Sequence, residues 1–117
     1  RSLDDVISTV PSMNSSHPER AMKLLLQCRH LAPVYGVKTL LSPESRDPLV
    51  IEHVPDIFHA GHIHALGYCN YRGVLIVNSG GWQEQTDYMR RLGFVPTPGK
   101  VPVVNLQTLE VNIVPFD

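Results

Sequence analysis

Several features that would fix the class of this protein are scarce in its sequence. Two cysteines among 117 residues are too few for a disulfide framework. There is no run of about 18 apolar residues, so no segment is predicted to span a membrane. Ten lysines and arginines against eleven acids leave a net charge of −1, so any nucleic-acid partner must be held by a local patch.

The length allows one domain at most, and no internal repeat divides it. The first residue is Arg1, without a methionine or the apolar core of a signal peptide, so we expect the chain to be cut from a longer protein. Cys28 falls on an apolar helical stripe, which predicts a reduced, buried thiol and favours an intracellular origin.

Two helices are predicted in the first quarter of the chain. Ser2-Leu3-Asp4-Asp5 has the pattern of a capping box with a serine N-cap, and Pro11 ends the helix that follows. Pro18 suits the first turn of a second helix. One buried face of that helix is predicted from apolar residues at helical spacing: Ala21, Leu24, Leu25 and Cys28.

Short strands are predicted in the remainder of the chain. Apolar runs at residues 49–51 and 57–58 are typical of strands covered on both faces. A tight turn at Arg72-Gly73 predicts a hairpin, and a second pair of strands is split by Gln107-Thr108. The strands of these two hairpins are expected at residues 68–71, 74–77, 101–106 and 109–114. The predicted class is mixed α/β (α+β), with helices packed on a sheet.

Three of the six histidines lie within residues 58–65, and two of them flank Ile63. If this run is extended, His62 and His64 project to one side and can bind one metal ion, or two ions about 3.5–4 Å apart. Gly61 would allow a sharp turn and a close approach by a ligand. Two ordinary hydrogen-bonded surface histidines explain the pair equally well, and a structural zinc with Cys69 stays open. His59 is expected to pack beside the pair rather than to bind metal.

The order Gly61-His62-Ile63-His64, a hairpin, then Asn78-Ser79-Gly80 resembles the last motif of the calcineurin-like metallophosphoesterases. A narrower resemblance runs over nearly the full chain, to the small subunit of the archaeal family-D DNA polymerases. Its most specific part is Val77-Asn78-Ser79-Gly80-Gly81-Trp82-Gln83-Glu84-Gln85-Thr86-Asp87. Two further stretches support it: Arg29-His30-Leu31-Ala32-Pro33 and Pro96-Thr97-Pro98-Gly99-Lys100-Val101-Pro102.

This resemblance implies that residues 1–117 are the C-terminal portion of a metallophosphoesterase domain, part of a four-layer αββα sandwich. It implies a manganese-dependent 3′–5′ exonuclease that proofreads during DNA replication, working with a large catalytic subunit on a single-stranded DNA 3′ end. His62 and His64 would each bind a different one of two divalent ions. Asn78, Ser79 and Trp82 would form the loop beside the substrate. The resemblance further implies a cytoplasmic, nucleoid-associated protein.

The family's upstream metal motifs are missing from these residues: there is no D-x-H, G-D-x-x-D or G-N-H-D. Two imidazoles do not hold two hard cations without carboxylates, so the chain alone is not expected to be a complete enzyme. The alternatives are a non-catalytic scaffold B-subunit of a replicative polymerase, or another calcineurin-like phosphoesterase.

Three expectations concern how these residues lie in space. The rings of His62 and His64 should face the same open cleft as Asn78. Trp82 either stacks on an unpaired base or lies in the core beneath the sheet. Arg90-Arg91 either join Arg72 and Lys100 in a phosphate-binding patch or form a solvated helix face.

Overall fold

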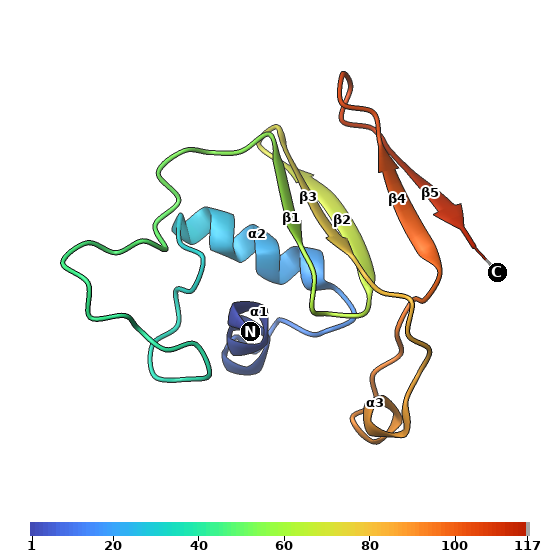
Figure 1. Cartoon of the computed structure of the whole chain (residues 1–117), viewed down its shortest axis with the longest axis horizontal. Coiled ribbons are helices and arrows are strands. Elements are labelled where there is room, and N and C mark those ends of the chain that lie inside the picture. Colours follow the sequence, from blue (N-terminus) through green and yellow to red (C-terminus); the bar gives the residue numbers. More distant parts are fainter. Residues whose placement is uncertain (117) are drawn as a thin grey trace.

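The computed structural model describes residues 1–116 as short helices and strands joined by long connections (Figure 1). In chain order the elements are α1 (Ser2–Thr9), α2 (Pro18–Cys28), β1 (Ile57–Ala60), β2 (Leu66–Tyr71), β3 (Val74–Ser79), α3 (Asp87–Arg91), β4 (Lys100–Val104) and β5 (Val111–Pro115). The mixed α/β (α+β) class predicted from the sequence is confirmed. Among residues 1–116, no helix combines the length and the apolar character needed to cross a bilayer.

The two N-terminal helices begin for different reasons. The N-cap of α1 is Arg1 and no side chain caps the helix, so the predicted serine cap is wrong: Ser2 is already the first helical residue. α2 begins at Pro18 as predicted, because proline lacks only an N–H that would have no partner in the first turn. The left-handed backbone of Arg29, with φ 54°, ends α2.

The buried face of α2 differs from the predicted one by part of a turn. Cys28 is exposed, so the expectation of a buried thiol is wrong. The helix turns its C-terminal end out of the core at this point, and the residues that point inward come earlier. The buried residues of α2 are Pro18, Ala21, Met22, Leu25 and Leu26. Together with Leu3 and Val6 of α1, their side chains cover one face of a sheet.

That sheet has three strands in the order β1-β3-β2, with β1 parallel and β2 antiparallel to the central strand β3. β2 and β3 form the predicted hairpin about Arg72-Gly73, where both residues have positive φ. Val74 and Ile76 face the helices, and by strand alternation Leu75 and Val77 face the other way. All four are buried, so β3 is covered on both faces.

β4 and β5 pair antiparallel in a separate two-stranded sheet, joined by residues 105–110. The predicted hairpin is therefore present, with shorter strands and a longer loop. Between β3 and β4 the chain leaves the sheet and carries the short helix α3 (Figure 1). Helices on one face of a mixed sheet, with further strands beside it, agree with a part of an αββα sandwich.

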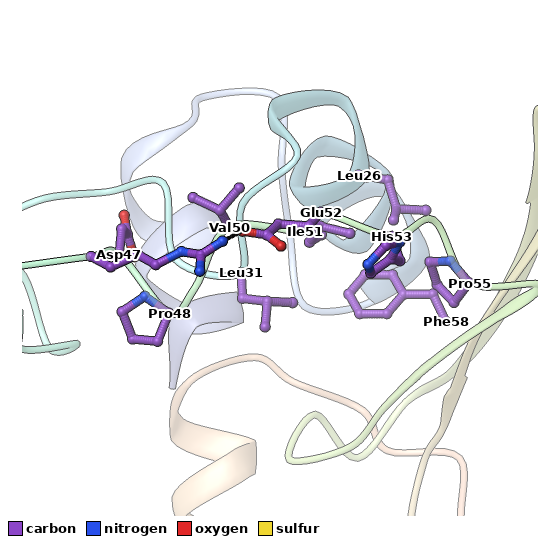
Figure 2. Close-up of a pocket in the computed structure, with 11 residues that line it drawn as sticks. Leu26, Leu31, Asp47, Pro48, Val50, Ile51, Glu52, His53, Pro55 and Phe58 are labelled. Atoms are coloured by element: carbon purple, nitrogen blue, oxygen red, sulfur yellow. Dashed lines mark hydrogen bonds and ion pairs between the residues drawn. The ribbon is translucent and has the colours of Figure 1, made fainter.

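Residues 29–56 contain no helix or strand, so the strand predicted at residues 49–51 is wrong. Val50 forms only an isolated bridge to His30, which gives a strand too little pairing to continue. Side chains hold the segment instead: Arg29 donates to the carbonyls of Ile51 and Glu52, and His30 pairs with Asp47 at 2.7 Å. Under it lies a cavity of about 570 Å³, which Leu31, Ile51 and Phe58 help to line (Figure 2).

Candidate functional site

A pocket of about 350 Å³ lies beyond the carboxyl end of β1, and both His62 and His64 line it. We call it the histidine pocket. Its lining comes from five parts of the chain: Asp4, Ser15, Lys38, His62, Ile63, His64, Tyr88, Met89, Leu92 and Phe94. The sequence-based expectation that the two imidazoles share one cleft is confirmed.

The backbone brings the two rings together in a way that the sequence did not predict. Residues 61–65 lie outside any strand, and His62 has a left-handed backbone with φ 71°. The expected extended run is therefore wrong. The sharp turn is at His62 rather than at Gly61, where an added Cβ would meet no atom within 4 Å. What Gly61 does provide is open space beside the pair.

Asn78 fixes this loop from below. It is fully buried at the end of β3, and its Nδ2 donates hydrogen bonds of 2.7 Å to the carbonyls of Ile63 and Ala65. The expectation that Asn78 faces the same cleft as the rings is wrong, because the residue is fully buried outside the pocket lining. Its Nδ2 is bonded to the backbone beneath the rings, and its Oδ1 is buried without a partner within residues 1–116. Asn78 thus positions the histidines, and two buried carbonyls would lose their donor without it.

His62 has a partner that sequence spacing did not reveal. Its Nε2 lies 2.7 Å from Oδ2 of Asp4, in the first turn of α1. The side chain of His62 is 55% exposed and that of Asp4 25%, so the pair lies at the mouth of the pocket. With a neutral ring, Nε2 carries the proton towards the carboxylate and leaves the lone pair on Nδ1. Asp4 is 58 residues away in the sequence, and only the fold brings it to His62.

His64 lies deeper, and one of its ring nitrogens has no protein partner. Its Nδ1 is buried and makes no hydrogen bond within residues 1–116. The ring lies over Gly81, where an added Cβ would be 3.7 Å from its Cγ. The carbonyl of His64 accepts a hydrogen bond from the amide of Thr97 at 2.9 Å, so its backbone is fixed while its ring is free to accept a ligand. Four buried side-chain atoms within residues 1–116 lack a partner, and His64 Nδ1 is the one whose residue lines the histidine pocket.

The other predicted site residues lie outside the pocket. Ser79 Oγ is 3.0 Å from Nε2 of His59, which joins the ends of β3 and β1. Trp82 is 68% exposed and contacts Phe116 edge to face, with the ring centres 5.8 Å apart. The core alternative for Trp82 is therefore wrong. Trp82 follows Gly81 in the sequence, but its indole lies on the surface against Phe116.

The four predicted phosphate-binding cations do not form one patch. Arg72 is in the turn between β2 and β3, whereas α3 carries Arg90 and Arg91 near the opposite end of the sheet (Figure 1). Arg90 is paired with Asp87 at 2.9 Å. The segment contributes apolar side chains instead, because Met89 of α3 and Leu92, just after the helix, form one wall of the histidine pocket. A five-residue helix has too short a pattern for its inner face to be predicted from sequence.

The residues present fit a metal centre only in part. The orphaned Nδ1 of His64 and the Asp4-bound ring of His62 suit neutral nitrogen ligands. Yet within residues 1–116 no three or more His, Cys, Asp or Glu side chains are grouped so that they could hold an ion. His62, His64 and Cys69 are therefore not grouped as the proposed structural-zinc site requires. The Cys69 thiol is half buried in β2, and burial raises its pKa.

Comparison with known proteins places these residues in context. The chain is 50% identical over 103 residues to a DNA polymerase II small subunit of Archaeoglobus fulgidus, covering 88% of this chain and 21% of that protein. It is 45% identical over 111 residues to one of Pyrococcus furiosus, covering 95% and 18%. A Halobacterium salinarum small subunit is 43% identical over 117 residues, covering 98% and 23%.

The chain is homologous to a segment of the archaeal DNA polymerase II small subunits. The resemblance to an archaeal DNA polymerase small subunit, noted in the sequence, is thereby confirmed. The chain spans about a fifth of the length of the curated relatives it matches. No protein-family model matches it. The histidine pocket therefore lies in a chain that matches one segment of such a subunit.

Proposed function

We propose that this chain forms one side of a metal-dependent 3′–5′ exonuclease site in the small subunit of a DNA polymerase. The observation that carries the proposal is the pair His62 and His64, held in one pocket by the buried Asn78 clamp, with His64 Nδ1 lacking a protein partner. Similarity to DNA polymerase II small subunits supports DNA as the polymer on which such a site would act.

In this proposal each imidazole has a defined role. Nε2–H of His62 donates a hydrogen bond to the Asp4 carboxylate, which fixes the ring and leaves the lone pair of Nδ1 for an ion. His64 offers its unpartnered Nδ1 as the second nitrogen ligand. Both are neutral donors, which suit Mn²⁺ alongside carboxylate oxygens. Two such ions would supply an activated water and stabilise the charge on the attacked phosphate.

The remaining ligands would come from other segments of the full-length subunit, since residues 1–116 hold no complete group. Gly61 leaves open space next to the imidazoles, which suits the approach of a phosphate. Trp82 is exposed, so its indole would be free to stack on an unpaired terminal base. The large catalytic subunit of the polymerase would release the unpaired 3′ end of the DNA, which would then bind at this site.

One observation favours a second function. The absence of a complete ligand group within residues 1–116 also suits a scaffold subunit that binds no metal and only joins polymerase components. The two functions differ in what they require of His64. A scaffold gains nothing from a buried imidazole nitrogen without a partner, and removing that ring would leave its assembly unchanged.

The proposal is tested by metal binding to the full-length subunit. Mn²⁺ affinity is measured by calorimetry for the unmodified protein, for His64→Ala, and for His53→Ala, an exposed histidine outside the pocket. We expect His64→Ala to weaken binding about tenfold or more and His53→Ala to leave it unchanged. Equal affinities for all three proteins would contradict the assignment and favour the scaffold.

A further inference from the structure

A second concave site lies at the far end of the sheet from the histidine pocket. It is a groove of about 270 Å³ between the C-terminal half of α2 and the turn that joins β2 to β3. We call it the α2 groove. Its lining residues are Leu26, Gln27, Arg29, Val54, Tyr71, Arg72 and Val74. No acidic side chain is among them.

The cations around the α2 groove are unpaired. Lys23 Nζ stands over the Tyr71 ring, 5.3 Å from its centre, and the Arg72 guanidinium stands over the same ring at 5.6 Å. None of the ion pairs within residues 1–116 involves Lys23, Arg29 or Arg72. Arg29 uses its guanidinium on two backbone carbonyls, which fixes its position but leaves its charge uncompensated.

What distinguishes these cations is that Lys23 and Arg72 share one aromatic ring, since Arg1, Arg20 and Arg91 also lack an ion pair within residues 1–116. Arg46 is paired with Glu52, and Arg90 is paired with Asp87. Like charges held near one ring repel each other, and contact with the negative face of an aromatic ring offsets only part of that repulsion. Three fixed cations around one groove therefore form a local anion-attracting site on a chain whose net charge is −1.

The floor of the groove is apolar. Leu26 and Val74 are buried core residues whose side chains reach the groove, and Val54 forms an exposed edge. A volume of about 270 Å³ accepts one large side chain rather than a whole small-molecule ligand. The Tyr71 ring already carries two cations, so it offers little open face for stacking a base, which binding of unpaired nucleic acid would use.

We propose that the α2 groove binds a peptide segment of a protein partner in which one large apolar side chain is flanked by carboxylates. The apolar side chain would enter between Leu26, Val54 and Val74. Its acidic neighbours would bind Lys23, Arg29 and Arg72 on the rim. The inference is independent of the exonuclease proposal, because it uses no residue of the histidine pocket.

A labelled peptide tests the groove in the purified full-length subunit. The probe carries two glutamates, a leucine, a phenylalanine and two aspartates, and its binding is followed by fluorescence anisotropy. A second peptide replaces the leucine and phenylalanine with serine, and a twelve-nucleotide oligothymidine serves as the nucleic-acid probe. The protein variants are Lys23→Glu with Arg72→Glu, then Val54→Trp, which fills the groove without changing its charge. Arg91→Glu is the control, an exposed cation on α3.

We expect saturable binding of the first peptide, weakened at least about tenfold by the charge reversal and by Val54→Trp, and retained by Arg91→Glu. The serine peptide should bind at least about tenfold more weakly. Circular dichroism of each variant checks that it is folded. Absence of saturable binding, or equal binding by all variants or by both peptides, overturns the proposal. The proposal is also overturned if the charge reversal weakens oligothymidine binding but leaves peptide binding unchanged, because the groove would then be a nucleic-acid contact.

Discussion

The Nε2 of His62 lies 2.7 Å from Oδ2 of Asp4, although 58 residues separate them in the sequence. This hydrogen bond joins the first turn of α1 to the loop after β1 and fixes which ring nitrogen of His62 faces outwards. A carboxylate behind a ligating imidazole raises the basicity of the ligand and holds the ring in place. Asp4 is therefore central to the proposed chemistry without needing to contact a metal.

Asp4→Asn keeps the shape of the side chain and removes its charge. In the full-length subunit we expect exonuclease activity in Mn²⁺ to fall about 10- to 100-fold, with little change in the unfolding transition. Asp87→Asn on α3 is the matched control, an exposed carboxylate whose side chain pairs only with Arg90. Unchanged activity in Asp4→Asn would show that the contact with His62 has no part in the reaction.

Asn78→Ala removes the two donors that hold the loop below the histidines. Because the carbonyls of Ile63 and Ala65 would be left without this partner, we expect the free energy of unfolding to fall by about 2 kcal/mol. Urea denaturation measures this, with the exposed Asn112→Ala on β5 as the control. A change of stability no larger than that of the control would mean that the clamp contributes nothing to the fold.

Asp5 predicts how stability depends on pH. The pKa of the Asp5 carboxyl is lowered, first by the Thr39 side chain beside it and then by the amides of Thr39 and Lys38. Burial acts in the opposite direction and raises this pKa, but it does not outweigh them. A depressed folded-state pKa means that the ionised group stabilises the fold above the unfolded value of about 3.9. That contribution is lost as the pH falls through the folded-state pKa.

Asp5→Asn should therefore be less stable than the unmodified chain at pH 7 and should lose less further stability on acidification to pH 3. Urea unfolding at both pH values measures the difference, with the exposed Asp56→Asn as the control. If the unmodified chain and Asp5→Asn lose the same free energy of unfolding between pH 7 and pH 3, Asp5 does not hold the connection at residues 38–39.

The chain by itself should hydrolyse neither DNA nor a simple phosphodiester in Mn²⁺. The physical reason is that its described residues offer too few grouped ligands for two hard cations. Release of nucleotides from a labelled single strand measures this, with a chelator-treated sample alongside. Robust activity that the chelator abolishes would show that residues 1–117 contain a complete site.

Local patterns in the sequence were enough to predict part of the fold. Pro18 began α2, and Arg72-Gly73 formed the turn of the β2–β3 hairpin, because both depend on a few adjacent dihedral angles. The prediction of a strand at residues 49–51 was wrong because a strand needs a neighbouring strand to pair with, and Val50 forms only one isolated bridge. The prediction that Cys28 is buried was wrong because the position of the sheet determines which face of α2 is buried.

The candidate site, too, could be predicted only in part from local sequence patterns. The spacing of His62 and His64 predicted two imidazoles in one cleft, and the structure brings them there. Neither the left-handed turn at His62 nor the burial of Asn78 has a sequence signal of its own. The contact of His62 with Asp4 and the wall formed by α3 depend on the packing of distant segments, which no local pattern encodes.

If His64 binds a metal ion for exonuclease chemistry, its loss should affect the exonuclease activity and spare the polymerase activity of one complex. Exonuclease and polymerase activities are measured in the same assembled complex, made with unmodified full-length small subunit or with His64→Ala. We expect the variant to assemble and to polymerise normally, because a single imidazole over Gly81 contributes little apolar burial. Its exonuclease rate should fall about a hundredfold or more, since a misplaced ion misplaces the attacking water. An unchanged exonuclease rate, or loss of the complex itself, would contradict the account.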